Sequence, residues 1–387
     1  MTEAVVVQTD ATESVAAGVV LGDQIHAAFG GAAPDALIVF ASSRYAYAPL
    51  LGACQDRCRP SLLVGCSSAG EFSGTTAQEG SASAIALRST DMRFSAGIAR
   101  ELHLDRVTAA RQLVSAFQGL TTQDYQYRAA LVLTDALAGH ADDLVDQLTL
   151  RTAGLYQFFG GGAGDDARFQ RTHVFFGGEA FTDAAVCLEM LSNKPIGVGV
   201  SHGWTPAGKR LRVTEADGMR LISLNAAPAV EAFEDHAAAT GQRFDRADPL
   251  PFFLHNVVGI DTDVGFRLRV PLAVHPDGSV TCAAEIPSGA TVAIMEASSS
   301  PADTASLAAE AALRQIAGYQ PKVGIFFDCV ATRLRLGRAF GLELDAIGRA
   351  LSPAAFAGCN TYGQIARADG QFSGFHNCTA VVCVLPD

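Results

Sequence analysis

The chain has 387 residues, of which 49% are hydrophobic and 18% charged, and its 28 Lys and Arg against 40 Asp and Glu give a net charge of −12 at pH 7. This length and composition indicate a compact globular protein of two or three domains and exclude a disordered chain. Because the acidic balance repels phosphate backbones and anionic lipid, we expect no nucleic-acid partner and no membrane partner.

The N-terminus and the cysteines indicate the compartment. The first ten residues lack the basic start and the apolar core of a signal peptide, and no run approaches the roughly eighteen apolar residues that a spanning helix needs. The nine cysteines are an odd number and stand mostly in apolar stretches, which fits reduced buried thiols better than a disulfide framework. The sequence therefore predicts a soluble, cytoplasmic protein.

The first part of the chain alternates apolar strand patterns with helical ones. Residues 1–30 are rich in Ala, Gly and Thr with weak helical character, and we expect them to be a lead-in segment. A helix is expected after the capping residue Asp105, closed by Gly119. The other elements expected up to residue 201 are strand 36–41, helix 45–58, a strand into Gly65, strands 81–87, 92–99 and 129–134, helix 142–152, a strand into Gly160, and strands 173–176, 184–191 and 197–201.

The acidic stretch 242–248 is the predicted domain boundary, which gives a first domain of 31–241 and a second of 242–387. Beyond it the pattern predicts a hairpin through Pro276-Asp-Gly278 and a helix capped by Ser300. Strands joined by helices and by hairpins predict an α/β fold of layered mixed sheets with helices on the outer faces.

Two stretches repeat one pattern. Gly65-Cys-Ser-Ser-Ala-Gly-Glu71 and Gly358-Cys-Asn-Thr-Tyr-Gly-Gln364 each follow a strand and a helix and precede another strand. This order predicts a duplicated strand-helix-strand-turn-strand unit. The glycine-rich stretch Gly160–Asp166 stands in a similar order, which suggests that the first half is itself double.

Four stretches together resemble the FIST family, a two-part sensory domain of bacterial signalling proteins and of some F-box proteins. They are Gly65–Glu71, Gly160–Asp166, Val200-Ser-His-Gly-Trp204, and Thr361–Arg367 with Phe375–Asn377. The resemblance implies an N-terminal and a C-terminal FIST domain and a cytoplasmic sensor that binds a small molecule. It also implies similarity to free-standing bacterial members that sense nitric oxide through haem and act on a histidine kinase or a cyclic-di-GMP enzyme.

The glycine turns suggest where a ligand binds, because without a Cβ the backbone N–H groups can converge on a carboxylate or carbonyl. Each turn is equally compatible with an ordinary tight reversal between strands. If two units pack about a pseudo-twofold axis, Glu71 and Gln364 point into one pocket. The candidate ligand-binding residues are Gly65, Ser67, Ser68, Glu71, Tyr362, Gly363, Gln364, Arg367 and Asn377.

A haem would need an axial ligand, an apolar wall and a cation for its propionates. His376 is the first candidate for the iron, with Phe372 and Phe375 beside it and Arg367 close in sequence, and His202 is the second. A histidine at a strand end is also a common structural hydrogen-bonding residue, and Arg367 could instead pair with the neighbouring Asp369.

Catalytic patterns are weak. Gly65–Gly70 lacks the strand-to-helix turn of a nucleophile elbow, and Gly160–Asp166 has no lysine for phosphates. The leading hypothesis is a sensor without enzymatic activity that binds a small molecule, with haem as a possible cofactor, and acts on a separate signalling protein such as a histidine kinase. The alternatives are a sensor of non-haem, amino acid-like molecules, an enzyme with a glycine-turn oxyanion site, and an interaction scaffold.

Overall fold

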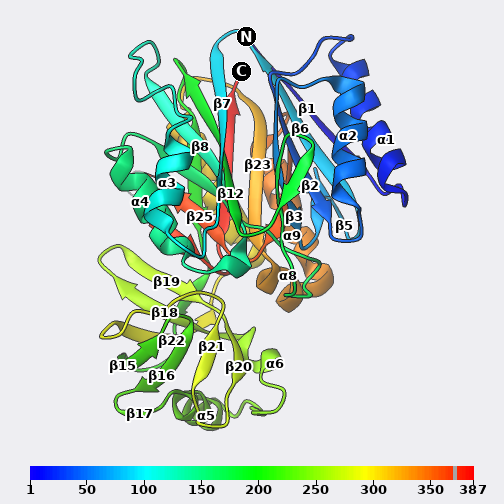
Figure 1. Ribbon diagram of the computed structural model, residues 1–387. Coiled ribbons are helices and arrows are strands. Elements are labelled where there is room, and N and C mark those ends of the chain that lie inside the picture. Colours follow the sequence, from blue (N-terminus) through cyan, green and yellow to red (C-terminus); the bar gives the residue numbers. More distant parts are fainter. Residues whose placement is uncertain (369–372) are drawn as a thin grey trace.

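Three repeated units, numbered one to three along the chain, form the larger part of the molecule (Figure 1). The computed structural model describes residues 1–368 and 373–387. Each unit runs strand, helix, strand, helix, strand, hairpin, strand, and its two central strands are parallel because helices connect them. Unit one consists of β1 (Thr2–Thr9), α1 (Ser14–Ala28), β2 (Ala36–Ser42), α2 (Tyr47–Cys58), β3 (Leu62–Ser68), β4 (Glu71–Ser73), β5 (Thr76–Gln78) and β6 (Ala82–Ser89).

Units two and three repeat this order, although an insertion interrupts unit three after its first strand. Unit two consists of β7 (Met92–Arg100), α3 (Arg106–Val114), β8 (Tyr127–Thr134), the short helix η1 (Ala136–Ala138), α4 (Ala141–Arg151), β9 (Gln157–Gly162), β10 (Val174–Phe176), β11 (Glu179–Phe181) and β12 (Ala184–Ser192). Unit three consists of β13 (Gly197–Ser201), α7 (Pro301–Gln315), β23 (Pro321–Cys329), α8 (Val330–Leu336), η2 (Gly337–Phe340), α9 (Gly341–Leu351), β24 (Ala355–Thr361), β25 (Gln364–Arg367), β26 (Ser373–His376) and β27 (Ala380–Pro386).

Each unit builds a six-stranded mixed sheet that a hairpin from another unit completes. The strand orders are β1-β6-β2-β3-β10-β11, β26-β25-β9-β8-β12-β7 and β13-β27-β23-β24-β4-β5. Unit two therefore lends its hairpin to unit one, unit three to unit two, and unit one to unit three. Since every unit gives one hairpin and receives one, the three units close into a ring, which we call the body. The predicted α/β fold with mixed sheets is confirmed.

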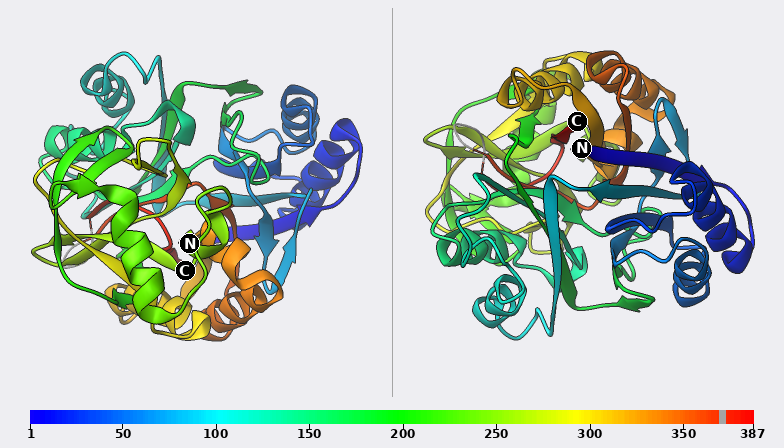
Figure 2. Two further views of the ribbon diagram at one scale, coloured as in Figure 1. Left: turned by 90° about the horizontal axis from the view of Figure 1, so that it is seen from below. Right: turned by 90° about the horizontal axis from the view of Figure 1, so that it is seen from above.

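The three sheets face a shared centre, and the helices lie outside them (Figure 2). Strand β2 shows why, because its side chains alternate between two apolar layers. Ile38 and Phe40 belong to the central core, whereas Leu37 and Val39 pack under α1 and α2. In the centre Phe40 meets Phe327 of unit three edge to face, with ring centroids 5.5 Å apart. The central core thus joins the units, and each outer core belongs mostly to one unit.

A smaller domain is inserted between β13 and α7 and lies below the body in Figure 1. We call it the inserted domain. It is a nine-stranded sheet in the order β19-β18-β22-β15-β16-β21-β20, with β14 and β17 paired beside it. It consists of β14 (Trp204–Pro206), β15 (Leu211–Asp217), β16 (Arg220–Leu224), β17 (Ala227–Pro228), α5 (Ala229–Thr240), α6 (Leu250–Phe253), β18 (Asn256–Thr262), β19 (Gly265–Arg269), β20 (Pro271–Val274), β21 (Val280–Cys282) and β22 (Thr291–Ala297).

The structure divides the chain differently from the expected domains. Residues 1–30 are no lead-in segment, because β1 pairs along its whole length with β6 and α1 packs on α2. The acidic stretch 242–248 lies between α5 and α6, within the inserted domain. The chain instead leaves the body after Ser201 and returns before Pro301. An insertion inside a repeat produces no single change of composition where the chain leaves the body or returns to it. The acidic stretch 242–248 therefore marks a loop of the inserted domain and not one of its ends.

The repeat is threefold rather than twofold. The pattern predicted at both ends of the chain is present, in units one and three. The first half of the chain contains two units, as its second glycine-rich stretch suggested, and this gives three units in all. Helix α3 has the expected cap, with Asp105 accepting from the Val107 N–H, but it ends at Val114, well before Gly119. The cap predicted for α7 is observed at Ser300, and α5 ends at Gly241 in the left-handed conformation.

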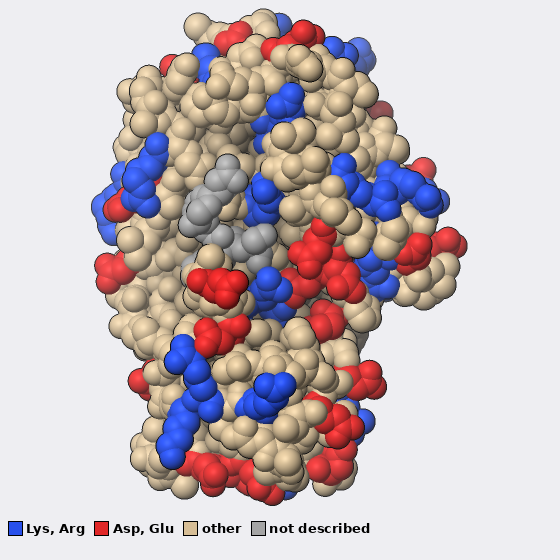
Figure 3. All heavy atoms as spheres, turned by 90° about the vertical axis from the view of Figure 1, so that its left-hand side faces the viewer, with Lys and Arg blue, Asp and Glu red and all other residues tan. Residues whose placement is uncertain are grey.

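The surface carries both signs of charge. On the face shown in Figure 3, basic and acidic side chains are interspersed over the body and the inserted domain. Within residues 1–368 and 373–387, no helix is both long and apolar enough to cross a membrane.

Candidate functional site

The three glycine turns meet and interlock at the carboxyl ends of the parallel strand pairs. Backbone hydrogen bonds connect the three turns in a closed ring. The three bonds, each of 2.9 Å, run from the Ala69 N–H to the Asn360 carbonyl, from the Gly164 N–H to the Ser67 carbonyl and from the Tyr362 N–H to the Gly162 carbonyl. These N–H groups are therefore engaged in joining the units, which favours tight reversals over a set of free donors for an oxyanion.

The first glycine of each turn has a packing reason. Gly65, Gly160 and Gly358 stand at equivalent places, and a Cβ on any of them would overlap the carbonyl oxygen of the adjacent parallel strand. Gly363 has a φ of +122°, and a Cβ there would overlap the Phe375 ring. These glycines permit the close approach of strands and rings.

The polar residues of the first turn are buried and satisfied within unit one and its neighbour. Ser67 Oγ accepts the His173 N–H at 2.8 Å. Glu71 accepts from the Ser68 hydroxyl, and from the N–H and the hydroxyl of Ser81 at 3.0 and 2.8 Å. Burial raises the pKa of Glu71 to about 7. This carboxyl group connects β4 to the start of β6, and it does not line the apolar cavity between the body and the inserted domain.

The counterpart of Glu71 in unit three has its own partners. Gln364 donates from Nε2 to Thr361 Oγ1 at 2.8 Å, and its Oε1 accepts the Thr379 N–H at 3.3 Å. The expected meeting of Glu71 and Gln364 presumed a twofold axis, whereas the repeat has three units, and each of the two side chains has its own partners. Arg367 donates from Nη1 to the Tyr156 carbonyl at 2.6 Å.

The two candidate histidines are both enclosed. His202 has its Nε2 3.1 Å from the Phe266 carbonyl oxygen, and its Nδ1 accepts the Trp204 N–H at 3.3 Å. His376 is 1% exposed, and burial, aided by the charge of Arg267, lowers the pKa of its imidazole to about 3. The His376 ring is therefore neutral, and burial also lowers the pKa of the partly buried His202. The candidates Phe372 and Asp369 lie outside the described residues.

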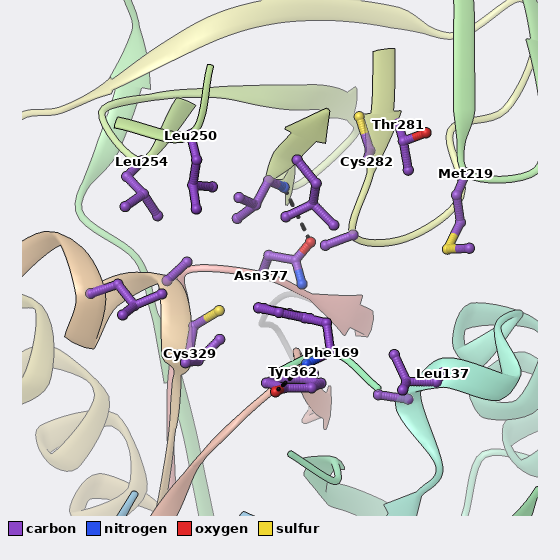
Figure 4. A pocket seen from close by; sticks show the side chains of 17 residues that line it. Leu137, Phe169, Met219, Leu250, Leu254, Thr281, Cys282, Cys329, Tyr362 and Asn377 are labelled. Atoms are coloured by element: carbon purple, nitrogen blue, oxygen red, sulfur yellow. Dashed lines mark hydrogen bonds between the residues drawn. The ribbon is translucent and has the colours of Figure 1, made fainter. Parts of the chain in front are cut away.

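An apolar cavity of about 170 Å³ lies between the body and the inserted domain (Figure 4). It opens at the carboxyl ends of the parallel strands of units two and three, where α/β proteins commonly bind ligands. The body contributes Ala136, Leu137, Phe169, Cys329, Val330, Ala331, Leu334, Tyr362 and Asn377. The inserted domain contributes Met219, Leu250, Leu254, Val270, Leu272, Thr281, Cys282 and Ala283. No charged side chain is among these described lining residues.

Asn377 is the principal polar group of the cavity. Its Oδ1 accepts the Val270 N–H at 3.2 Å, the bond drawn in Figure 4. Its Nδ2 donates to the His376 carbonyl over a long 3.4 Å, the one bond from this nitrogen among the described residues. A carboxamide carries two N–H donors, so one remains for a ligand.

Two stacked rings form one wall, and a buried carboxylate outside the lining fixes their position. Phe169 lies flat on Tyr362, with centroids 4.3 Å apart and planes 14° apart, as Figure 4 shows. The Tyr362 hydroxyl donates to Asp165, and burial together with this bond raises the pKa of the phenol. Asp165 also accepts the N–H groups of Phe169, Gln170 and Arg171 at 2.7–2.8 Å. One carboxylate thus fixes both the loop and the ring that line the cavity.

Two thiols border the cavity. Burial raises the pKa of Cys282 to about 12, so it is a neutral apolar wall. Cys329 differs, because a hydrogen bond from the Cys378 thiol lowers its pKa in spite of complete burial. The lining of the cavity is therefore suited to a mostly apolar molecule.

A buried ion pair holds the inserted domain on the body. Arg269 of β19 is 0% exposed and pairs with Asp142 at the start of α4. Its Nη1 also donates to the Phe375 carbonyl at 2.8 Å. Burial alone would raise the pKa of Asp142, but Arg269 and Arg267 hold it below its usual value. We call this group the interdomain clamp.

A haem does not fit these residues as they stand. Neither His376 nor His202 borders the apolar cavity, and the ring nitrogens of His202 are engaged with backbone groups. The cavity itself is below the roughly 300–1,000 Å³ of ordinary cofactor sites.

The structure brings two of the sequence candidates, Tyr362 and Asn377, to this cavity and leaves the others in the body's packing. Phe169 was not identified as a candidate from the sequence. Phe169 follows the second glycine turn closely, and the equivalent turn of unit three contains the candidate Tyr362. The walls from the inserted domain gave no signal, because single apolar residues on separate strands form no local pattern.

Comparisons with known proteins identify the family. The FIST N domain matches residues 35–227 and the FIST C domain residues 229–367, so their border falls at the start of α5 inside the inserted domain. No curated protein matches the chain.

Among solved structures, the chain is similar to a cyanuric acid hydrolase from A. caulinodans, with a TM-score of 0.36 and 7% identity over 100% of this chain and 99% of that one. A second structure, titled as a cyanuric acid hydrolase that evolved by structural concatenation, has a TM-score of 0.31 and 10% identity over 100% of both chains. These scores are too low to support any argument about activity. FIST domains are known sensory domains of signalling proteins, and with most of its length matched by both halves, the chain belongs to the FIST family.

Proposed function

We propose that this protein is a ligand-binding sensor whose ligand is a small, mostly apolar molecule held between the body and the inserted domain. The apolar cavity carries this proposal, because both domains build its walls and it is about 170 Å³ in volume. A dry apolar cavity of about 150 Å³ is known to hold benzene, so a molecule the size of one ring fits.

The lining favours one kind of ligand. An amino acid would need partners for two charges, whereas the described lining residues carry none. The spare N–H of Asn377 suits a molecule with one acceptor oxygen on an apolar frame. The lining therefore excludes an amino acid-like ligand from this cavity. It supports a small, mostly apolar molecule, and not haem, as the ligand.

Binding at a domain junction explains how occupancy is reported. A ligand shifts an equilibrium only if it binds one arrangement better than another, and a ligand touching both domains meets this condition. Occupancy of the cavity would stabilise the closed arrangement that the interdomain clamp holds. A separate signalling protein, such as a histidine kinase or a cyclic-di-GMP enzyme, would respond to that arrangement.

Calorimetric titration with p-cresol and toluene tests the proposal. We expect both to bind the wild type, with p-cresol tighter because its oxygen can accept from Asn377. The variant Ala283→Leu fills the cavity and should abolish binding. Ala273→Leu, at an exposed position of strand β20 that is not part of the lining, is the matched control and should bind normally.

A second measurement tests the signalling step. Spin labels at Gln112→Cys on α3 and Ala239→Cys on α5 report the distance between the domains, since both positions are exposed. p-Cresol should narrow the distance distribution in the wild type but not in Ala283→Leu. If p-cresol and toluene fail to bind, or bind Ala283→Leu equally well, the cavity is not the sensory site.

A further inference from the structure

The loop of residues 165–173 separates two sites of opposite character. It contributes Phe169 to the apolar cavity, and Arg168, Arg171 and His173 to a polar cleft of about 350 Å³. The other side of this cleft is the turn between β2 and α2 in unit one. Small-molecule sites commonly have volumes of roughly 300–1,000 Å³. We infer that this cleft binds a small oxyanion, that is, a phosphate or carboxylate group.

Two uncompensated cations stand at the cleft. Arg168 and Arg171 are exposed, and neither guanidinium makes an ion pair with a carboxylate in the described part of the chain. Three other exposed arginines, Arg57, Arg210 and Arg246, each pair with an acid at 2.5–2.6 Å. In a chain of net charge −12, this cleft carries two arginines without an ion pair against one lining carboxylate, Asp165.

Helix α2 adds to the positive potential. It spans Tyr47–Cys58, and its N-cap residue Ala46 provides no side-chain cap. Ala46 and Tyr47 both line the cleft, so the start of the helix lies at its wall, and the Ala46 N–H itself donates to Ser14 Oγ at 2.9 Å. The start of a helix carries a partial positive charge and unsatisfied N–H groups, which favour an oxyanion.

Two buried polar atoms at the cleft lack normal partners. His173 Nδ1 has no hydrogen-bond partner among the described residues. Burial, aided by Arg171, lowers the pKa of His173, so the ring is neutral and can donate from Nδ1. The buried Tyr47 hydroxyl makes no hydrogen bond of regular geometry, although Ser67 lies close to it. An oxyanion in the cleft would accept from both groups.

Two carboxylates lie near the cleft, Asp165 as one of its lining residues, and neutral backbone and hydroxyl donors already hydrogen-bond to both. Asp165 accepts three N–H groups of the loop and the Tyr362 hydroxyl. Asp166 accepts the Ser43 N–H and the Ser42 hydroxyl, each at 2.9 Å, and the Ser43 hydroxyl. The groups still able to bind an anion are therefore the arginines, the helix start, His173 and Tyr47.

Calorimetric titration of the full chain with inorganic phosphate and with succinate, at matched ionic strength, tests the inference. We expect one site for at least one of the two anions, and the preferred anion identifies the source. Arg168→Gln and Arg171→Gln should each weaken binding about tenfold, because each removes a charge-assisted hydrogen bond. Arg349→Gln on α9, which is exposed and has no described ion pair, should bind as the wild type does.

Imidazole NMR gives an independent measurement. Saturating anion should shift the His173 ring signals in the wild type and in Arg349→Gln, and circular dichroism should confirm that each variant is folded. Failure of both anions to bind the wild type would overturn the inference. So would wild-type affinity in both cleft variants, or an equal loss in Arg349→Gln, which would indicate nonspecific charge.

Discussion

The apolar cavity and the polar cleft occupy corresponding places in the repeat but differ in chemistry. Each begins where the first parallel strand of a unit ends, in the turn toward the following helix. In units two and three these turns supply Ala136, Leu137 and Val330, whereas in unit one the turn supplies Ser43 and Tyr47. Repeat geometry thus places a hollow at each turn, and the local residues decide what it can bind.

The inserted domain accounts for the second difference. It closes the apolar cavity with Leu250, Leu254 and Leu272, and it contributes no lining residue to the polar cleft. Apolar walls need such a cover, because water would otherwise fill a hollow of this kind at a cost in free energy. A polar cleft can remain open to solvent. The comparison predicts that changes at the domain interface affect one site and spare the other.

Breaking the interdomain clamp should have the largest effect. Arg269→Met leaves the largely buried Asp142 without its closest cation, and removal of one partner of a buried pair costs about 3–5 kcal/mol. We expect this loss in urea unfolding, together with loss of p-cresol binding and retention of phosphate binding.

The control for this variant is Arg246→Ala, which removes an exposed ion pair with Glu234. Exposed pairs contribute about 1 kcal/mol or less, so this change should be nearly neutral. Equal destabilisation by the two variants would contradict the assignment of Asp142 and Arg269 as the clamp.

Gly65 tests whether the turns are structural. Because a Cβ there would overlap the Val39 carbonyl, Gly65→Ala should destabilise the protein by about 3 kcal/mol, at the upper end of overpacking effects. Gly52→Ala in the middle of α2, where no atom lies within 4 Å of the added methyl, should stabilise by about 0.5–1 kcal/mol. Thermal unfolding of both variants measures the contrast, and a neutral Gly65→Ala would refute the packing role.

The sequence predicted the parts of the fold that depend on local pattern. The strand and helix periodicities, the cap at Ser300 and the repeated glycine turns are all properties of short stretches. The exchange of hairpins between units is not, because β4, β10 and β25 pair with strands distant in sequence. The sites followed the same rule: Tyr362 and Asn377 stand in a recognisable motif, whereas Arg168 became significant only once its lack of a partner was visible.

Glu71 of unit one, whose carboxyl group is fully buried, makes the stability of the protein depend on pH. Below pH 4.5 the Glu71 carboxyl is protonated in both the folded and the unfolded state, so its contribution to the free energy of unfolding is fully present. As pH rises toward 7 the unfolded state ionises first, because burial raises the folded pKa to about 7, and stability falls. The loss above pH 7 amounts to about 3 kcal/mol at most.

Glu71→Gln should remove this part of the pH dependence. In chemical denaturation at pH 5 and pH 8, we expect the difference in unfolding free energy between the two pH values to shrink relative to the wild type. The pair Asp328 and Glu343, whose carboxyl pKa values burial also raises, is common to both proteins and cancels in the comparison. An unchanged difference would show that Glu71 is ionised in the folded protein.

Tyr362→Phe tests whether the two sites are coupled through the loop between them. The Tyr362 hydroxyl donates to Asp165, which in turn holds the N–H groups that fix Phe169 beside the apolar cavity and Arg171 beside the polar cleft. Loss of one such hydrogen bond costs about 1 kcal/mol, so affinities for both p-cresol and phosphate should fall roughly fivefold. Tyr319→Phe, at an exposed tyrosine, is the control. In the wild type, saturating phosphate should change the p-cresol affinity by the same factor that p-cresol changes the phosphate affinity, since binding coupling is reciprocal. A variant that weakens only p-cresol binding would show that the loop serves the apolar cavity alone.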